Sequence, residues 1–554
     1  MRRGPVLLAL GLLGAPTVAH AQAVRTWGAT PDTPPPAGSA APGAAAAPGA
    51  SAPASPPEPP PATIGTPVPG STSAPASPPV TEAAPPEPRV GTSVGPKYTL
   101  EGIEVRGNTA TLSRVVLRYV PFHAGDVVDV DDPQLELTRY RLLGTGFFRD
   151  VQLSLRRGTR RGWVVLVVDV VERNTIVVND VWLGIASDVN SNGFAEPITA
   201  YGGARVTENN LAGTGIALGG AFAVANGQLG LRASLADPQF LGSTWITEAE
   251  LLYNDARDFY GNGDVLVGGG GSTTNSSVDY AIADYTRLGG RLGAGHDVGV
   301  SSQVFFDYRL ERIDASYPEA ASDHLGLDVE PVDFMLIRGT SVLSAVRATF
   351  VQDTRDEPFL PTQGHRLVAS IDAGLTPFGS DYPYTKLTLH GSKWVGLPWG
   401  HVLALDGFAG AIFGNAPLFE RFYVGDLSDL LPDRALDLAF DRRPAPNLLG
   451  TDIVENRYGT YAAKVDAEYR IPIYRGTRSI YGVDFFGSVG LYGLANENDF
   501  TDHPRGYTGF STWPIDLTFN AGLRMDTQAG GFVFGVSNLI GFIPVRGEHQ
   551  GAVQ

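Results

Sequence analysis

The chain has 554 residues, a formal net charge of −17 and no cysteine. This length is enough for two or three domains, and the absence of thiols excludes a disulfide framework and a thiolate metal site. Nucleic acid is a poor partner for so acidic a chain, because phosphate binding needs a basic surface. No apolar run of about 18 residues follows the N-terminal region, so we do not expect a helical membrane protein.

Residues 1–21 predict a secretory signal peptide. Arg2 and Arg3 precede an apolar run from Val6 to about Val18, and Ala19-His20-Ala21 provides a cleavage site of the small-x-small type. A buried helix is the alternative interpretation. We therefore expect the protein to be exported from the cytoplasm.

Residues 22–96 are dominated by Pro, Ala and Ser, and they hold half of the 42 prolines. Such a segment buries too little apolar surface to offset the entropy of ordering, so it predicts an unstructured, partly polyproline tether. As a coil it would average roughly 50 Å from end to end. We interpret it as a spacer rather than as a cell-wall or partner-binding region.

Residues 97–173 predict a small α+β unit of about 80 residues. Asp132 followed by Pro133 is a favourable helix start, because the first caps the helix and the second suits its first turn. The unit reads strand, helix, helix, strand, strand, with these ranges: 98–105, 112–120, 133–143, 150–156 and 163–171.

Residues 174–542 show the period-two alternation of a transmembrane β-barrel. In Gly459–Ile473, apolar and aromatic residues such as Val465 and Tyr469 alternate with charged residues such as Asp466 and Glu468. Side chains of a strand alternate between its faces, so one face is apolar and the other charged. At roughly 23 residues for a strand and its connection, the segment holds about 16 strands, the even number expected of bacterial barrels.

Direct inspection places fifteen strands and leaves one unassigned. They are 176–185, 198–207, 215–224, 227–236, 244–255, 279–294, 299–313, 340–353, 364–374, 384–396, 400–413, 459–472, 480–492, 514–526 and 531–542.

Two groups of motifs carry a family resemblance. In the N-terminal unit, YTLEGIEVRGNTATL and LLGTGFFRDVQLSL resemble a polypeptide-transport-associated (POTRA) domain, of which we find one. Over residues 97–542 the chain resembles the BamA/TamA superfamily of outer-membrane assembly and secretion barrels. The barrel motifs, in chain order, are NLAGTG from Asn210, DPQFLG from Asp237, DTRDEPF from Asp353, FERFYVG from Phe419, YRIP from Tyr469 and GLRMDT from Gly522.

The resemblance implies a transmembrane antiparallel β-barrel in the outer membrane, with the POTRA domain and the tether in the periplasm. It implies insertion and folding of other β-barrel proteins, with partner polypeptides bound by strand addition at a sheet edge. The expected partners are unfolded outer-membrane or secreted polypeptides and the lipid bilayer, with periplasmic chaperones or accessory lipoproteins as further partners. A secretion pore that exports a polypeptide through the barrel and a passive channel remain the alternatives.

The long loop 426–458 departs from the family pattern. The family places a Val-Arg-Gly-Phe motif here, and its Arg pairs inside the barrel with an Asp of a neighbouring strand. In this chain Arg434 lies nearest to that position, ahead of Arg442 and Arg443, and Ser488 stands where the Asp is expected.

We therefore expect Arg434 to fold inward and pair with Asp466, Glu468 or Asp484, since a buried charge needs a partner. A solvated Arg434 on an extracellular loop is the alternative.

The C-terminus is the second departure. Family barrels end on an aromatic residue that closes the last strand and that the assembly machinery reads, whereas here Phe542 is followed by a tail, 543–554. Phe542 is the candidate for that signal.

No catalytic, cofactor or metal site is expected. Asp188, Asn190, Asn192 and Gly193 imitate the start of a calcium loop, but the twelfth position is Thr199 rather than Glu, so we predict a hairpin turn. The Gly-rich segment 261–277 lacks the Lys-Ser/Thr of a phosphate loop and is expected to be an extracellular loop. Zinc-protease and serine-hydrolase motifs do not occur, and charged side chains are ordinary in the wet lining of a barrel.

Overall fold

The structure of the chain is a computed structural model, and it describes residues 96–261, 265–267, 276–325, 328–428, 434–443, 447–504 and 506–537. The predicted signal peptide, almost all of the Pro/Ala tether, and Phe542 lie outside the described residues. Within the described part of the chain, no helix is both long and apolar enough to cross a membrane.

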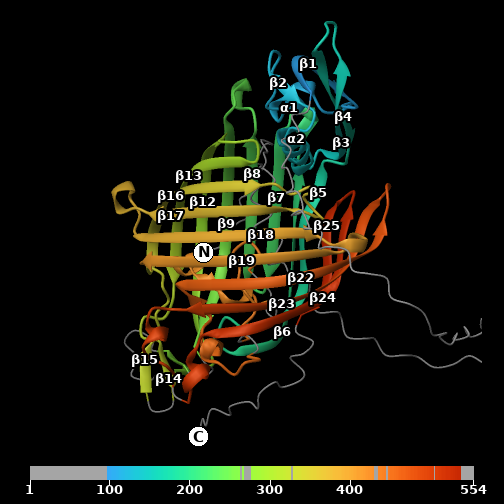
Figure 1. Cartoon of the computed structure of the whole chain (residues 1–554). Coiled ribbons are helices and arrows are strands. Elements are labelled where there is room, and N and C mark those ends of the chain that lie inside the picture. The colour runs from blue at the N-terminus through green and yellow to red at the C-terminus, as the bar shows by residue number, and fades with distance from the viewer. Residues whose placement is uncertain are drawn as a thin grey trace, which may run out of the picture. The chain divides into compact units, whose positions relative to one another are not determined.

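Residues 97–172 form a four-stranded sheet in the order β2-β1-β4-β3, with two helices (Figure 1). The predicted cap of the second helix is present, because the Asp132 carboxylate accepts a hydrogen bond from Gln134 N with Pro133 in the first turn. The prediction missed β2, a three-residue strand that exists only because it pairs with β1. The elements are β1 (Lys97–Arg106), α1 (Ser113–Arg118), β2 (Val127–Asp129), α2 (Pro133–Gly144), β3 (Phe148–Arg157) and β4 (Trp163–Glu172).

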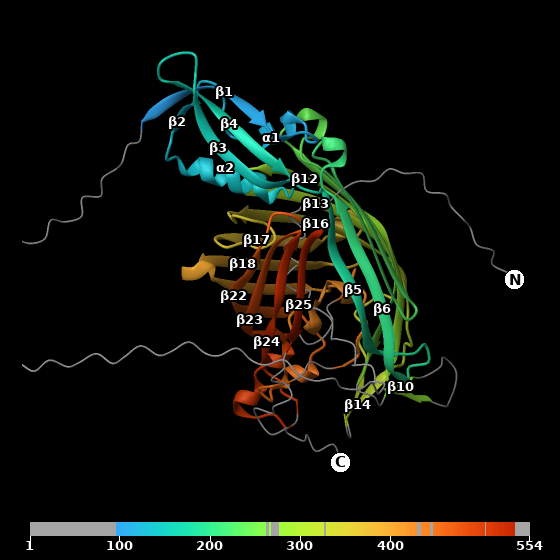
Figure 2. The same ribbon diagram turned by 90° about the vertical axis from the view of Figure 1, so that its right-hand side faces the viewer.

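The residues described between 176 and 537 include a 15-stranded antiparallel sheet that curls into a β-barrel (Figures 1 and 2). Each of the fifteen strand positions predicted by inspection is occupied by one of its strands, although the length-based estimate was about 16. The strands are β5 (Ile176–Val189), β6 (Ala195–Glu208), β7 (Ala217–Ala225), β8 (Gln228–Asp237), β9 (Ile246–Tyr260), β12 (Ala281–Asp297), β13 (Ser302–Ser316), β16 (Gly339–Asp353), β17 (Gly364–Gly374), β18 (Tyr384–Gly396), β19 (Val402–Gly414), β22 (Tyr461–Arg475), β23 (Ile480–Ala495), β24 (Ile515–Thr527) and β25 (Gly530–Ser537).

The turn between β5 and β6 is the hairpin predicted in place of a calcium site. Asn190 Oδ1 accepts hydrogen bonds from Asn192 N at 2.9 Å and Phe194 N at 3.2 Å. Gly193 has a φ of 87°, which suits a residue without a Cβ. The side-chain oxygen of Asn190 thus supports the backbone of the turn.

Short strands between the barrel strands form two further sheets that the sequence did not predict. A four-stranded sheet has the order β11-β10-β14-β15, and β20 pairs with β21. Strands this short have too few residues to show a period of two, and their stability comes from pairing with distant segments. They are β10 (Val265–Val267), β11 (Ser276–Val278), β14 (Ser322–Leu325), β15 (Asp328–Pro331), β20 (Phe422–Tyr423) and β21 (Tyr458–Gly459).

The barrel strands turn their apolar face outward and their charged face inward, as predicted. On β13 the Phe306 side chain is 63% exposed, whereas Glu311, on the opposite face, is 1% exposed. On β22, Val465 is exposed while Glu468 and Arg470 are buried. An apolar exterior around a polar interior is the arrangement of a membrane barrel.

Candidate functional site

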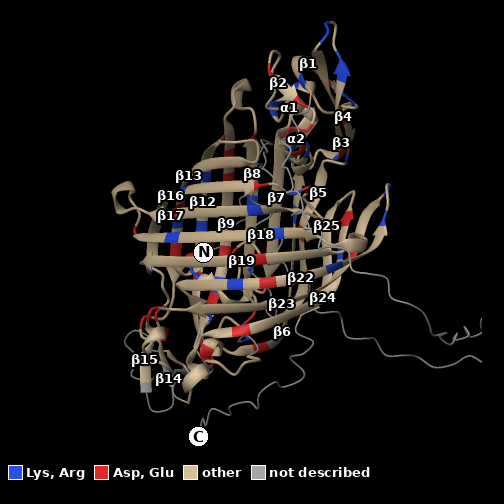
Figure 3. Ribbon diagram, viewed as in Figure 1, with Lys and Arg blue, Asp and Glu red and all other residues tan. Residues whose placement is uncertain are grey.

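Acidic and basic residues recur along the barrel strands (Figure 3), and many of their buried side chains form ion pairs. On β22 and β24, both carboxylate oxygens of Glu468 accept hydrogen bonds from Arg524, at 2.5 to 2.9 Å. Arg470 Nε lies 3.6 Å from the same carboxylate. Strand alternation places Glu468 and Arg470 on one face, and Arg524 reaches Glu468 across the intervening strand β23.

Asp484 and Ser488, on β23, also face the lumen. The Asp484 carboxylate pairs with Arg475 Nη1 at 2.5 Å and lies 3.8 Å from Arg470 Nη1. Ser488 Oγ accepts a hydrogen bond from Asn520 Nδ2 at 3.0 Å. The carboxylate expected in the family at the position of Ser488 is thus replaced by a neutral hydrogen bond within the wall.

The predicted partners of Arg434 are wrong. Its guanidinium pairs with Asp426 of the same loop, at 2.8 Å, and not with Asp466, Glu468 or Asp484. It also donates to the carbonyl oxygens of Phe419, at 3.3 Å, and Arg421, at 3.2 Å. Asp466 is buried on the face of β22 that carries Glu468.

The alternative, a solvated Arg434, is not what the structure shows either. Its side chain is 12% exposed and its guanidinium lies over the ring of Tyr423, 5.5 Å from the centroid. Arg434 therefore folds inward as expected, but it fixes the base of the loop instead of reaching across the lumen.

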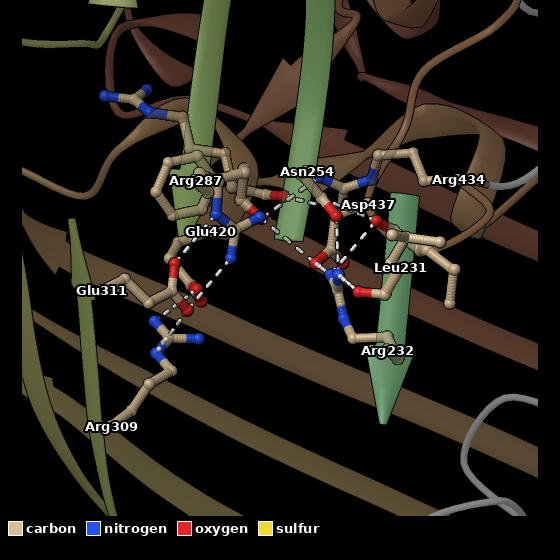
Figure 4. A network of polar contacts seen from close by, with 12 residues as sticks. Leu231, Arg232, Asn254, Arg287, Arg309, Glu311, Glu420, Arg434 and Asp437 are labelled. Atoms are coloured by element: carbon tan, nitrogen blue, oxygen red, sulfur yellow. Dashed lines mark hydrogen bonds and ion pairs between the residues drawn. The ribbon is translucent and has the colours of Figure 1, made fainter. Parts of the chain in front are cut away.

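Asp437 is the loop residue that does reach the wall, and the sequence analysis missed it. Its Oδ2 accepts from Arg232 Nη2 on β8 at 2.7 Å and from Arg287 Nη1 on β12 at 3.2 Å (Figure 4). The family pattern predicts an arginine of the loop paired with a carboxylate of the wall, whereas here the loop supplies the carboxylate and the wall supplies the arginines. Leu436 and Leu438 flank Asp437 in the sequence. Such an apolar pair is unusual in a solvated loop and could have indicated that this part of the loop is buried.

A second missed residue is Glu420, which lies within one of the family motifs. Its carboxylate accepts from Arg309 Nη2 at 2.6 Å and lies 3.4 Å from Lys386 Nζ. Glu311 connects this pair to the loop, because it lies 3.4 Å from Arg309 Nε and also binds Arg287. The wall and the loop thus share one continuous network of charges (Figure 4).

The two ends of the barrel sheet, β5 and β25, face each other, and we call the line between them the seam (Figure 2). Among the described residues, one backbone hydrogen bond crosses it, from Val178 N to Ala529 O at 2.7 Å. Beside it, Arg173 Nη2 donates to Thr527 O at 2.7 Å and pairs with Asp526 at 3.2 Å. These contacts gather at one end of the seam, where β5 begins and the β24–β25 turn lies.

The motifs NLAGTG and DPQFLG form turns that contact the N-terminal unit. Asn210 Nδ2 donates to Thr111 Oγ1 at 2.8 Å, and Leu112 N donates to Gly213 O at 3.0 Å. Arg118 Nε, in α1, donates to Pro238 O at 3.1 Å. The motif residues thus bind the first helix region, through the Asn210 side chain and through the backbone carbonyls of Gly213 and Pro238.

The N-terminal unit offers an open sheet edge, because β3 is the end strand of its sheet. A cavity of about 770 Å³ lies beside α2, β3 and β4. Its lining combines apolar with mostly basic side chains: Tyr98, Leu135, Leu155, Trp163, Arg139, Arg157, Arg160 and Arg161 among them. An edge strand beside such a groove can accept an extended peptide by backbone pairing.

Comparison with known proteins finds one matching domain and one similar curated protein. Residues 210–430 match the Omp85 superfamily domain. The chain is 22% identical over 457 residues to the outer membrane protein assembly factor BamA of Nitratidesulfovibrio vulgaris, an alignment that covers 78% of this chain and 50% of that protein. The chain thus spans about half the length of this relative.

Two solved structures to which the chain is similar are BamA from Haemophilus ducreyi lacking POTRA domains 1–3 and CdiB from Escherichia coli. The first has a TM-score of 0.42 at 15% identity, covering 79% of this chain and 80% of that chain. The second has a TM-score of 0.48 at 11% identity, covering 79% and 72%.

Proposed function

The chain is a BamA/TamA-type protein of the Omp85 superfamily, and on this premise we propose that it inserts and folds β-barrel proteins in the outer membrane. The same premise makes outer-membrane or secreted polypeptides its partners. We place the N-terminal unit, as a single POTRA domain, in the periplasm, where it would meet polypeptides before they reach the membrane.

The observation that carries this proposal is the seam. In the part of the chain that the structure describes, consecutive strands of the 15-stranded sheet are antiparallel, so its two end strands, β5 and β25, run in the same direction. An antiparallel ladder between them is therefore impossible, but one added strand of opposite direction can pair with either edge. A client strand entering the seam would find unpaired backbone groups as a template.

Membrane burial supplies the driving force for this templating. An unpaired N–H or C=O group in lipid costs several kcal/mol, so strand pairing at the seam is strongly favoured there. Burial of the apolar face of the client in the bilayer then drives folding to completion without a nucleotide. The β3 edge and its basic groove would hold the client in an extended conformation before transfer.

A secretion pore is the second candidate, and the loop inside the barrel favours it. Leu436, Leu438 and Phe440 of this loop are buried against the barrel interior, and noncovalent contacts hold them there. Such a segment could leave to open a path. In that case the client would pass through the lumen rather than the seam.

Two engineered disulfides distinguish the candidates, since the chain contains no cysteine. For the seam we choose Val177→Cys with Gly530→Cys, because a Cβ at position 530 would lie 2.9 Å from Val177 Cγ1, where the introduced sulfur would sit. For the lumen we choose Gly230→Cys with Leu436→Cys, because a Cβ at position 230 would lie 3.1 Å from Leu436 Cβ. Disulfides need Cβ atoms about 3.5–4.5 Å apart, so the second pair needs a small shift. The first pair also needs a shift, because Gly530 has a φ of 130° and a Cβ there would lie 2.7 Å from Val178 O.

The assay follows a urea-unfolded barrel protein as it folds in liposomes, with gel mobility as the readout and empty liposomes as the baseline. We expect faster folding with the unmodified protein and with the oxidised lumen pair, and loss of the acceleration with the oxidised seam pair. Reduction should restore the activity of the seam pair. Equal folding rates with and without the protein, when its own barrel is folded, would refute insertion and leave secretion or a passive channel.

A further inference from the structure

One stretch of the long loop, residues 434–443, lies within the barrel and is called the plug segment below. Its Leu436 carbonyl accepts from Asn254 Nδ2 of β9 at 2.8 Å, and its Ala439 carbonyl accepts from Gln228 Nε2 of β8 at 2.9 Å. The Phe440 ring stacks on Tyr201 of β6 with centroids 4.5 Å apart. The segment is therefore bound to one side of the wall, from β6 to β12.

The tip of the plug segment has a conformation that its own residues disfavour. Leu438 N donates to Ala435 O at 3.0 Å, which closes a turn whose two central residues, Leu436 and Asp437, have φ of 51° and 67°. Two consecutive positive φ angles suit Gly or Asn, whereas Leu has a steric penalty there. The contacts with the wall must therefore hold the turn in place.

This turn directs the Asp437 carboxylate toward two arginines of the wall. Asp437 Oδ2 receives hydrogen bonds from Arg232 and Arg287, which come from strands β8 and β12 (Figure 4). Arg287 is held in position independently of the loop, because Glu311 binds it at 2.9 and 3.2 Å and the Phe419 ring lies 3.8 Å from its guanidinium. Arg232 is likewise oriented by Asn254 Oδ1, at 2.6 Å.

We propose that Arg232 and Arg287 form a carboxylate-binding site on the lumen wall, and that Asp437 occupies it to hold the plug segment inside the barrel. The polarity is the reverse of the one expected from the family pattern, since the loop contributes the acid and the wall contributes the bases. Two preoriented guanidinium groups bind one carboxylate more strongly than a neutral donor would. Arg434 anchors the base of the loop, and Asp437 anchors its tip.

The first test asks where the plug segment lies and uses the Gly230→Cys/Leu436→Cys pair in the full chain, purified and inserted in liposomes. We expect the disulfide to form in high yield on mild oxidation. Failure to form it in a folded barrel, as judged by heat-modifiable gel mobility, would overturn the proposal, because the tip would not lie against β8.

The second test measures ion conductance in planar bilayers for Asp437→Asn and for a matched control, Glu455→Gln. Glu455 is an exposed carboxylate of the same loop that contacts Tyr507, away from the plug segment. Arg287 is 2% exposed and Asp437 is 24% exposed, so loss of this partly buried pair is expected to raise the fraction of open time of Asp437→Asn by roughly 10- to 100-fold. The control should behave as the unmodified protein does.

The two tests are then combined. In Asp437→Asn that also carries the cysteine pair, oxidation should close the pore and reduction should reopen it, which would show that exit of the plug segment causes the conductance. If Asp437→Asn matches both the control and the unmodified protein in open time, the proposal fails. These readouts need no client protein, so they are independent of the proposed insertion activity.

Discussion

The pair of Glu468 and Arg524 offers a direct test of how much the inner wall contributes to barrel stability. Glu468 is 1% exposed and receives three hydrogen bonds from Arg524, so Arg524→Gln leaves a buried carboxylate without its main counter-charge. Breaking a buried pair in this way costs about 3–5 kcal/mol. Arg470 remains 3.6 Å from Glu468 and offsets part of the loss.

We therefore expect the low end of that range, about 3 kcal/mol, or roughly a hundredfold in the unfolding equilibrium. Urea titration in detergent micelles, with the folded fraction read from unheated gel mobility, measures this change. Arg312→Gln is the matched control, because Arg312 and its partner Asp314 have side chains that are 64% and 43% exposed, and an exposed pair contributes at most about 1 kcal/mol. A cost for Arg524→Gln below about 1 kcal/mol, or equal to that of the control, would refute the reasoning.

Three further predictions concern other parts of the chain. In the N-terminal unit, burial alone would raise the pKa of Glu172, but hydrogen bonds from Thr109, Ala110 and Thr111 lower the pKa from 4.5 to about 2. The stability that Glu172 contributes to the N-terminal unit is thus complete above pH 4.5 and is lost as the pH falls toward 2. Hydrogen exchange should show this acid dependence in the unmodified chain and not in Glu172→Gln. Gly213→Ala should free the N-terminal unit from the barrel turn, because Gly213 has a φ of 74° and the new Cβ would lie 1.9 Å from Ala110 O. Limited proteolysis after β4 should then accelerate. Gly220→Ala should leave the rate of proteolysis unchanged, because a Cβ at position 220 has open space. Gly410→Ala would place a Cβ 2.2 Å from the Phe422 ring and should cost about 1–3 kcal/mol in urea titration, whereas Gly407→Ala, with its nearest atom at 3.9 Å, should cost less.

The sequence alone determined the barrel and the orientation of its strands. Alternation with a period of two is a local property, so residues such as Val465 and Glu468 could be assigned to opposite faces without knowing what lies beyond them. The same reasoning located every strand of the large sheet, and it identified the capped helix that begins at Pro133. The short strand β2 escaped because three residues are too few to show a period.

Only the tertiary structure decided which charges meet inside the barrel. Asp466, Glu468 and Asp484 were correctly placed on the inner face, but the partner of Arg434 proved to be Asp426, eight residues before it in the same loop. Asp437 reaches the wall through a turn whose positive φ angles are disfavoured by its own residues. Contacts with β8, β9 and β12 hold this turn in place. A strand pattern fixes the face on which a side chain lies, whereas an ion pair between a loop and a distant strand depends on how the whole loop folds into the lumen.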